Sequence, residues 1–169
     1  MSSPSVWALS LTYWLHMLAT VVWIGGLASL SLLVLPAARR SLEASAYSRL
    51  LENLQRRFDP LSWLCLAVLG VTGLFQMSAN LNYQGFLTIQ NRWAVAILLK
   101  HLVFIGMTAL SAYLTWGILP GLRRAALRQL RQPDGTQVLE LQRQEARLLR
   151  INLVLSVAVL ALTALARAS

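Results

Sequence analysis

Four long apolar segments constrain the fold of this chain more than any other feature of its sequence. A helix needs about 20 mostly apolar residues to cross the roughly 30 Å of hydrocarbon in a bilayer. The segments that meet this requirement run over residues 7–35, 60–79, 93–119 and 151–166. Only 12% of the residues are charged, about half the share in a typical soluble domain. We therefore predict an all-α protein, a four-transmembrane-helix bundle that forms a single integral membrane domain over residues 1–169.

Three prolines lie near the expected ends of these segments. Pro36 follows the first segment and Pro120 follows the third, and a proline disfavours helical geometry in the residue before it. Pro60 begins the second segment, where proline suits the first helical turn. We therefore expect the first helix to stop at Pro36 and the third helix to stop before Pro120.

Arginine is distributed unevenly among the connections. Five arginines lie between the first two segments and seven between the last two, whereas the middle connection holds only Arg92. Because positively charged loops stay on the cytoplasmic side, both termini are predicted to face outward, as in a bacterial inner (plasma) membrane protein. Some apolar residues of the first basic loop share one side of a helix, namely Leu50, Leu51, Leu54 and Phe58. We predict basic amphipathic cytoplasmic helical extensions that contact anionic headgroups of the inner leaflet.

The composition excludes several classes of protein. The net charge of +9 is explained by the membrane-flanking arginines, so no nucleic acid is expected as a partner. The single cysteine, Cys65, excludes a disulfide framework and any site with several thiolates. All six acidic residues lie outside the four apolar segments, and no phosphate-binding loop, nucleophile elbow or HExxH motif occurs. Hydrolysis and phosphoryl transfer are not expected, so any enzymatic activity would be that of an oxidoreductase.

The only two histidines are the most specific feature of the apolar segments. His16 lies nine residues after Trp7, and His101 lies eight residues after Trp93. Each histidine is therefore roughly 12–14 Å below the start of its helix, and both helices are predicted to run inward. The two imidazoles should occupy one layer of the outer half of the bilayer. The antiparallel segments and the neighbouring positions add to this layer Met17, Gln76, Met77, Lys100 and Thr163.

Two imidazoles at one depth suit the binding of haem b. Polar groups inside a membrane usually face the bundle interior and mark a site, and His16 and His101 are suited to be the two axial ligands of one haem iron. Lys100 and Arg92 would meet the propionates. Trp23 lies seven residues after His16, on nearly the same helix face, and the small residues Gly25 and Gly26 would leave room for a flat ring. Closed axial positions favour electron transfer or membrane redox chemistry, with an external redox partner or another membrane subunit at the outer face.

Two other hypotheses remain open. The first alternative is copper binding or copper transport, with His16, His101, Met17 and, as a weaker ligand, Met77 as soft-to-borderline ligands. The chain has only four methionines, and it lacks a Met- or His-rich capture segment. The second alternative is a small structural subunit of a larger membrane complex, in which the histidines form hydrogen bonds across packed helices.

Short motifs in three of the segments resemble those of a known superfamily. The stretch HMLATVVWIGGLASL, with W-x-G-G seven residues after His16, resembles the first helix of copper-resistance protein D (CopD) domains and of the related HemJ-type protoporphyrinogen oxidases. RLLENLQRRFDPLSWLCLAVLGVTGL is similar to their basic loop and second helix, and RWAVAILLKHLVFIGMTAL to their third. GILPGLRR resembles the end of that third helix in CopD domains. The resemblance covers most of residues 10–125.

The resemblance implies a four-helix membrane bundle that handles either copper or haem and porphyrin. His16 and Lys100 match positions that these families use, and Trp23 belongs to the first motif together with Gly25 and Gly26. His101, beside the lysine, is not matched to a position of the family pattern. This departure argues against the HemJ activity and favours paired ligation by two histidines in this chain.

Overall fold

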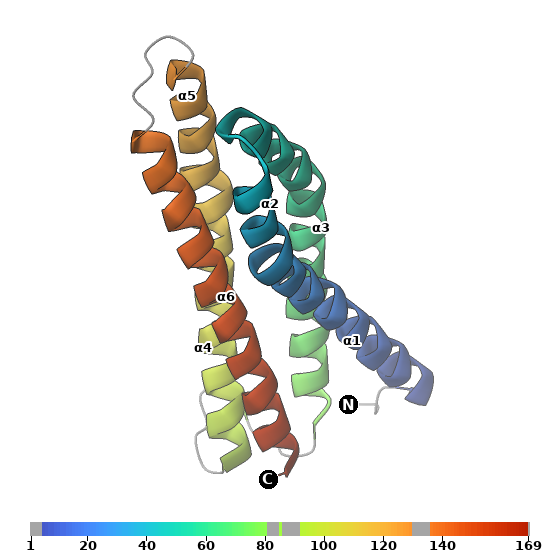
Figure 1. The fold of residues 1–169 in the computed structure, drawn as a ribbon. Helices are drawn as coiled ribbons and strands as arrows, with labels where there is room; N and C mark the ends of the chain where they lie inside the picture. The colour runs from blue at the N-terminus through green and yellow to red at the C-terminus, as the bar shows by residue number, and fades with distance from the viewer. Residues whose placement is uncertain (1–4, 81–84, 86–91, 130–135, 169) are drawn as a thin grey trace.

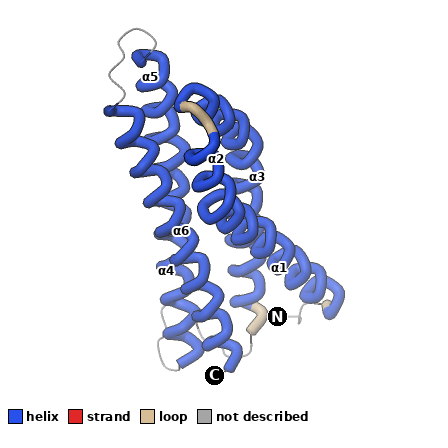
Figure 2. Tube along the Cα trace, in the orientation of Figure 1, coloured by secondary structure: helices blue, strands red, loops and turns tan. Residues whose placement is uncertain are grey.

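The computed structural model describes residues 5–80, 85, 92–129 and 136–168. Every regular element in these ranges is helical, with short loops where α2 meets α3 and after α3 (Figures 1 and 2). In chain order the elements are α1 (Val6–Ala28), η1 (Ser29–Val34), α2 (Leu35–Ser41), α3 (Ala44–Ser78), α4 (Arg92–Tyr113), η2 (Leu114–Ile118), α5 (Leu119–Gln129) and α6 (Thr136–Ala168).

Four continuous helical stretches are long and apolar enough to cross a membrane: Val6–Ser41, Arg49–Ser78, Arg92–Ala125 and Thr136–Ala168. This finding confirms the predicted all-α architecture with four membrane-spanning helices. The start of α1 and the end of α6 lie at one end of the bundle, which we call the terminal end (Figure 1). The opposite end, formed by α2, α5 and the start of α6, is the arginine end. The direction in which the bundle crosses the membrane remains a prediction from the arginine distribution.

The prolines do not end their helices, which corrects the expectation for Pro36 and Pro120. The helix continues through Pro36 to Ser41, and through Pro120 into α5. In both cases a π-helical turn precedes the proline, η1 before Pro36 and η2 before Pro120. A proline lacks the amide N–H and its ring crowds the carbonyl four residues earlier. A wider turn before the proline accommodates the ring without breaking the helix.

The helices pack as two pairs that meet along a common core. α1 packs chiefly on α3, and α4 packs chiefly on α6. Side chains from both pairs form one buried cluster, which includes Trp23, Leu66, Met107 and Leu149. Near the arginine end the two pairs are also joined by Trp63 of α3 and Trp116 of η2, whose stacked rings have centroids 5.1 Å apart. The space between the pairs contains the two cavities described next.

Candidate functional site

A cavity with a volume of about 320 Å³ lies between the two helix pairs. All four long helices line it, with His16 from α1, Gly73 from α3, His101 from α4 and Thr163 from α6. We call it the histidine cavity. Small-molecule sites in proteins have volumes of roughly 300–1,000 Å³ and mostly apolar walls, and this cavity is also lined mainly by apolar side chains. It is therefore large enough for a ligand.

His16 is oriented by a hydrogen bond between α1 and α3. Its Nδ1 lies 2.7 Å from the Thr72 hydroxyl oxygen, and that hydroxyl donates its own proton to the Val68 carbonyl. Because the hydroxyl proton is already used, the Thr72 oxygen acts as acceptor and Nδ1 carries the proton. The network thus assigns the tautomer of neutral His16, and its lone pair is on Nε2. Gly73 follows Thr72 in α3, and a Cβ added there would lie 3.6 Å from the His16 Cε1 atom.

His101 has the same tautomer for a different reason. Its Nδ1 lies 2.7 Å from the Ile97 carbonyl oxygen one turn earlier in α4. A carbonyl oxygen only accepts hydrogen bonds, so Nδ1–H is the donor and Nε2 carries the lone pair in the neutral ring. In metal sites a ligating histidine commonly donates its second ring N–H to a fixed acceptor, which orients the ring. Both histidines of this cavity meet that condition.

Three further side chains on the wall bear on what the cavity can hold. Lys100 brings an amine to it, and Met107, which is buried, brings a thioether. Trp23 is also buried, and its indole Nε1–H has no hydrogen-bond partner in the described part of the chain. The cavity thus combines two imidazoles, one thioether and one amine, surrounded by apolar and aromatic side chains.

The other sequence-predicted residues lie elsewhere. Met77 lines a much smaller neighbouring pocket, which it shares with Trp93 and His101. Arg92 is at the start of α4 and exposed. Gly25 faces open space, whereas an added Cβ at Gly26 would lie 3.3 Å from the Phe58 Cε1 atom of α3. Two further members of the predicted layer do not line the cavity: Met17 is 67% exposed, and Gln76 donates to the Thr12 carbonyl.

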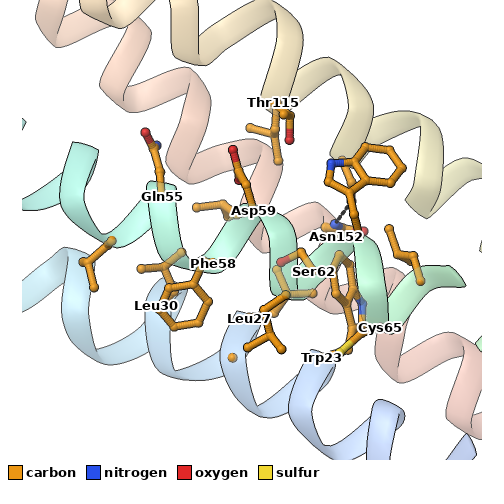
Figure 3. A pocket seen from close by; sticks show the side chains of 18 of the residues that line it. Trp23, Leu27, Leu30, Gln55, Phe58, Asp59, Ser62, Cys65, Thr115 and Asn152 are labelled. Atoms are coloured by element: carbon orange, nitrogen blue, oxygen red, sulfur yellow. Dashed lines mark hydrogen bonds between the residues drawn. The ribbon is translucent and has the colours of Figure 1, made fainter. Parts of the chain in front are cut away.

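A second, narrower cavity of about 80 Å³ lies nearer the arginine end. Asp59 of α3 and Glu145 of α6 both line it, and we call it the carboxyl cavity. Trp23 lines this cavity as well as the histidine cavity. In the view of Figure 3, Trp23, Cys65 and Asn152 lie at one end of it and Gln55 lies at the other. Gln55 donates to Glu145 through an Nε2–Oε1 hydrogen bond of 2.8 Å.

Sequence reasoning missed this second cavity because it assigned all the acidic residues to loops. The helices extend beyond the apolar segments, so Asp59 and Glu145 are part of α3 and α6. A signal for it was present in the sequence. Five polar residues of α6 recur at intervals of three, four or seven, which places them on one helix face. They are Gln142, Glu145, Asn152, Ser156 and Thr163, of which the first four are buried.

The donor set limits the kind of metal site that the chain can form. The described residues contain no group of three or more His, Cys, Asp and Glu side chains that could hold a metal ion. A site in the histidine cavity would therefore depend on the two imidazoles, with Met107 as a soft third donor. Imidazole suits copper, zinc, iron and nickel, and thioether sulfur favours Cu(I). The residues present fit either a low-coordinate soft ion or a cofactor whose own ring supplies the remaining ligands.

A comparison with protein families matches residues 52–166, more than half of the chain, to copper resistance protein D. The matched range includes Lys100, His101 and Met107. It begins after His16 and Trp23, so the first-helix motif lies outside it. No curated protein and no solved structure matches the chain.

Proposed function

The chain belongs to the copper resistance protein D family, and from this premise we propose that it binds copper within the membrane, at the two imidazoles of the histidine cavity. The observation that carries the proposal is that the only two histidines of the chain line one cavity between the helix pairs. Family membership reverses the order of the hypotheses from the sequence, in which haem b came before copper.

The chemistry of the wall favours the monovalent ion. Both histidines keep the Nε2 lone pair in the tautomers described above, and the Met107 thioether is a soft donor that suits Cu(I). The Lys100 amine lines the same cavity, and a positive charge there opposes a divalent ion more than a monovalent one. His16, His101 and Met107 would then hold Cu(I), and Lys100 would weaken the binding of Cu(II).

Haem b is the second candidate, and the size of the cavity favours it. A bare ion does not need about 320 Å³ of mainly apolar space, whereas a flat prosthetic group does. Trp23 and Phe104 line the wall, and rings of this kind pack well on a flat face. When bound, a bis-histidine haem supplies one-electron chemistry. His16 and His101 would hold its iron, and Lys100 would pair with a propionate.

One preparation distinguishes the two candidates. The full chain is purified in detergent without chelators, its metals are quantified, and a reduced-minus-oxidised absorption spectrum is recorded. Copper binding is then measured under reducing conditions by competition with a Cu(I) chelator. We expect one copper ion per chain, and an affinity at least tenfold lower in both His16→Ala and His101→Ala.

Two methionine variants provide the matched control. Met107→Leu removes a thioether on the cavity wall, and we expect it to weaken Cu(I) binding. Met17→Leu removes a thioether that is 67% exposed, and we expect no change. If both histidine variants bound copper as tightly as the wild-type chain, the proposal would be refuted. A haem absorption band that disappears in both histidine variants, with no copper bound, would select haem b instead.

A further inference from the structure

A groove with a volume of about 530 Å³ lies at the arginine end, outside both cavities. Its wall is formed by Arg39 of α2 and by residues of α6. The α6 residues are Arg143, Ala146, Arg147, Arg150, Ile151, Val154 and Leu155. We call it the arginine groove. It combines four guanidinium groups with an apolar surface, and neither the candidate metal site nor the carboxyl cavity uses it.

The α6 sequence produces a stripe that changes from basic to apolar along the helix. Arg143, Arg147 and Arg150 are spaced by four and three residues, so they share one helix face. Val154 continues that face one turn later and is 66% exposed, and the neighbouring Ile151 is 40% exposed. Seven residues separate the first and last arginines of the stripe, which is about 10 Å along the helix axis.

The arginine part of the stripe is long enough to span the polar headgroup layer of a leaflet. The polar layer on each side of the hydrocarbon is roughly 5–8 Å thick, so the arginines span this layer when Ile151 begins the hydrocarbon segment. Ile151 and Val154 then face the acyl chains. A groove with this order of groups is complementary to a molecule that has an anionic head and an apolar tail.

The position of Arg39 is fixed by contacts with its surroundings. Its Nε–H donates to the Tyr47 hydroxyl at 3.3 Å, and its terminal nitrogen donates to the Gln142 carbonyl of α6. These bonds hold Arg39 beside the basic stripe while leaving other N–H groups of its guanidinium. The ion pairs found among the described residues join Glu52 to Arg56 and Arg123, and neither of them involves a groove arginine. The charges of the groove are thus not neutralised by ion pairs within the described ranges.

We propose that the arginine groove is a binding site for an anionic phospholipid, with the phosphate at the arginines and an acyl chain along Ile151 and Val154. Basic pockets at the cytoplasmic ends of membrane helices bind such headgroups, and Arg forms bidentate bonds with phosphate oxygens. The exposed apolar residues adjoining the arginines favour a lipid over a free phosphate ion. The proposal is independent of the metal in the histidine cavity.

Native mass spectrometry of the detergent-purified full chain tests the proposal, with phosphatidylglycerol and phosphatidylcholine added in turn. The groove variant combines Arg143→Gln, Arg147→Gln and Arg150→Gln. We expect its affinity for phosphatidylglycerol to fall at least tenfold, because three phosphate-binding side chains are lost. The wild-type chain should retain phosphatidylglycerol in preference to phosphatidylcholine.

A matched variant removes the same charge elsewhere. It combines Arg57→Gln, Arg124→Gln and Arg128→Gln, three exposed arginines that do not line the groove, and should change the affinity less than twofold. Equal losses in both triple variants would show a general charge effect and overturn the site. So would displacement of the lipid by an equal concentration of inorganic phosphate. If the groove variant does not fold, Arg147→Gln alone should weaken binding about threefold, and an unchanged affinity would refute the proposal.

Discussion

Trp23 lines both the histidine cavity and the carboxyl cavity. The two cavities differ in whether their polar side chains have hydrogen-bond partners. In the histidine cavity, each imidazole has its Nδ1–H bound to a fixed acceptor. In the carboxyl cavity, Glu145 Oε2 and Asn152 Oδ1 are buried without a hydrogen-bond partner in the described part of the chain. Leaving such an atom unpaired costs about 1–3 kcal/mol. The imidazoles of the first cavity are thus oriented by fixed partners, whereas the second cavity retains unpaired side-chain oxygens that lower the stability of the fold.

This difference is informative about function, because a chain selected for stability alone would replace the unpaired groups. Evolution tolerates such costs where a site needs polar or ionisable side chains. Asn152 and Ser156 link the two cavities along α6, since Ser156 donates to the Asn152 carbonyl and lines the histidine cavity. The buried face of α6 therefore carries polar residues on both sides of Leu149, from Glu145 to Ser156 on the wall of the candidate metal site.

The first prediction tests whether the histidine cavity is preorganised. Thr72→Val keeps the shape of the side chain but removes the oxygen that accepts the His16 Nδ1–H. Because partners of this kind orient a ligating ring, their loss typically costs 10–100-fold in metal affinity. We expect the affinity for Cu(I), or for haem, to fall within that range in a titration of the purified protein.

Thr108→Val is the control for this prediction. Thr108, like Thr72, donates its hydroxyl proton to the carbonyl four residues earlier in its helix, but the hydroxyl that accepts from His16 is that of Thr72. Its replacement should leave the metal affinity unchanged. Equal affinities in wild type and Thr72→Val would mean that the hydrogen bond to His16 serves only helix packing.

The second prediction tests the cost of the carboxyl cavity. Glu145→Gln preserves the side-chain volume and the oxygen that accepts from Gln55, but it removes a buried carboxyl group. A buried carboxyl group without an ion pair lowers the stability of the fold when it ionises, so we expect the variant to be more stable by about 1–2 kcal/mol where the carboxyl group is ionised. Glu52→Gln should act in the opposite direction. It removes exposed ion pairs with Arg56 and Arg123, which are worth at most about 1 kcal/mol.

Denaturant unfolding in detergent, followed by circular dichroism, measures both changes. The contrast in sign between the two glutamates is the critical result. A loss of stability in Glu145→Gln similar to that in Glu52→Gln would show that the buried carboxylate is compensated by its surroundings, and that the two cavities do not differ in the way described above.

The fold was predictable from the sequence, because it depends on segment length. Segment length identified the four spanning helices, and the 1.5 Å rise predicted one level for His16, Lys100 and His101, which all line the histidine cavity. The direction in which each side chain points was harder to predict, because helix rotation is set by packing. Met17 adjoins His16 in the sequence, yet it is 67% exposed while His16 lines the cavity.

The carboxyl cavity was not predicted because hydropathy detects only the part of a helix that lies in hydrocarbon. α3 and α6 have 35 and 33 residues, well beyond the roughly 20 needed to cross a bilayer. Their extra turns carry Asp59 and Glu145 into the bundle. The expectation for Pro36 and Pro120 failed for another reason. It rested on the local preference of single residues, whereas the wider π-helical turns before them allow the helix to continue.

The third prediction addresses why the carboxyl cavity is the narrower of the two, and it has the smallest expected effect. Gly26 lines that cavity where α1 approaches Phe58 of α3. An added Cβ would lie 3.3 Å from the Phe58 Cε1 atom, so Gly26→Ala should push the helices apart and destabilise the protein by about 1 kcal/mol. Gly25→Ala places its methyl group in open space and should stabilise α1 by up to about 1 kcal/mol, because alanine favours helix over glycine. Thermal unfolding of the two variants in one detergent should therefore give shifts of opposite sign. Shifts of the same sign and size would mean that the Phe58 ring moves aside, and that the width of the carboxyl cavity does not depend on the contact at Gly26.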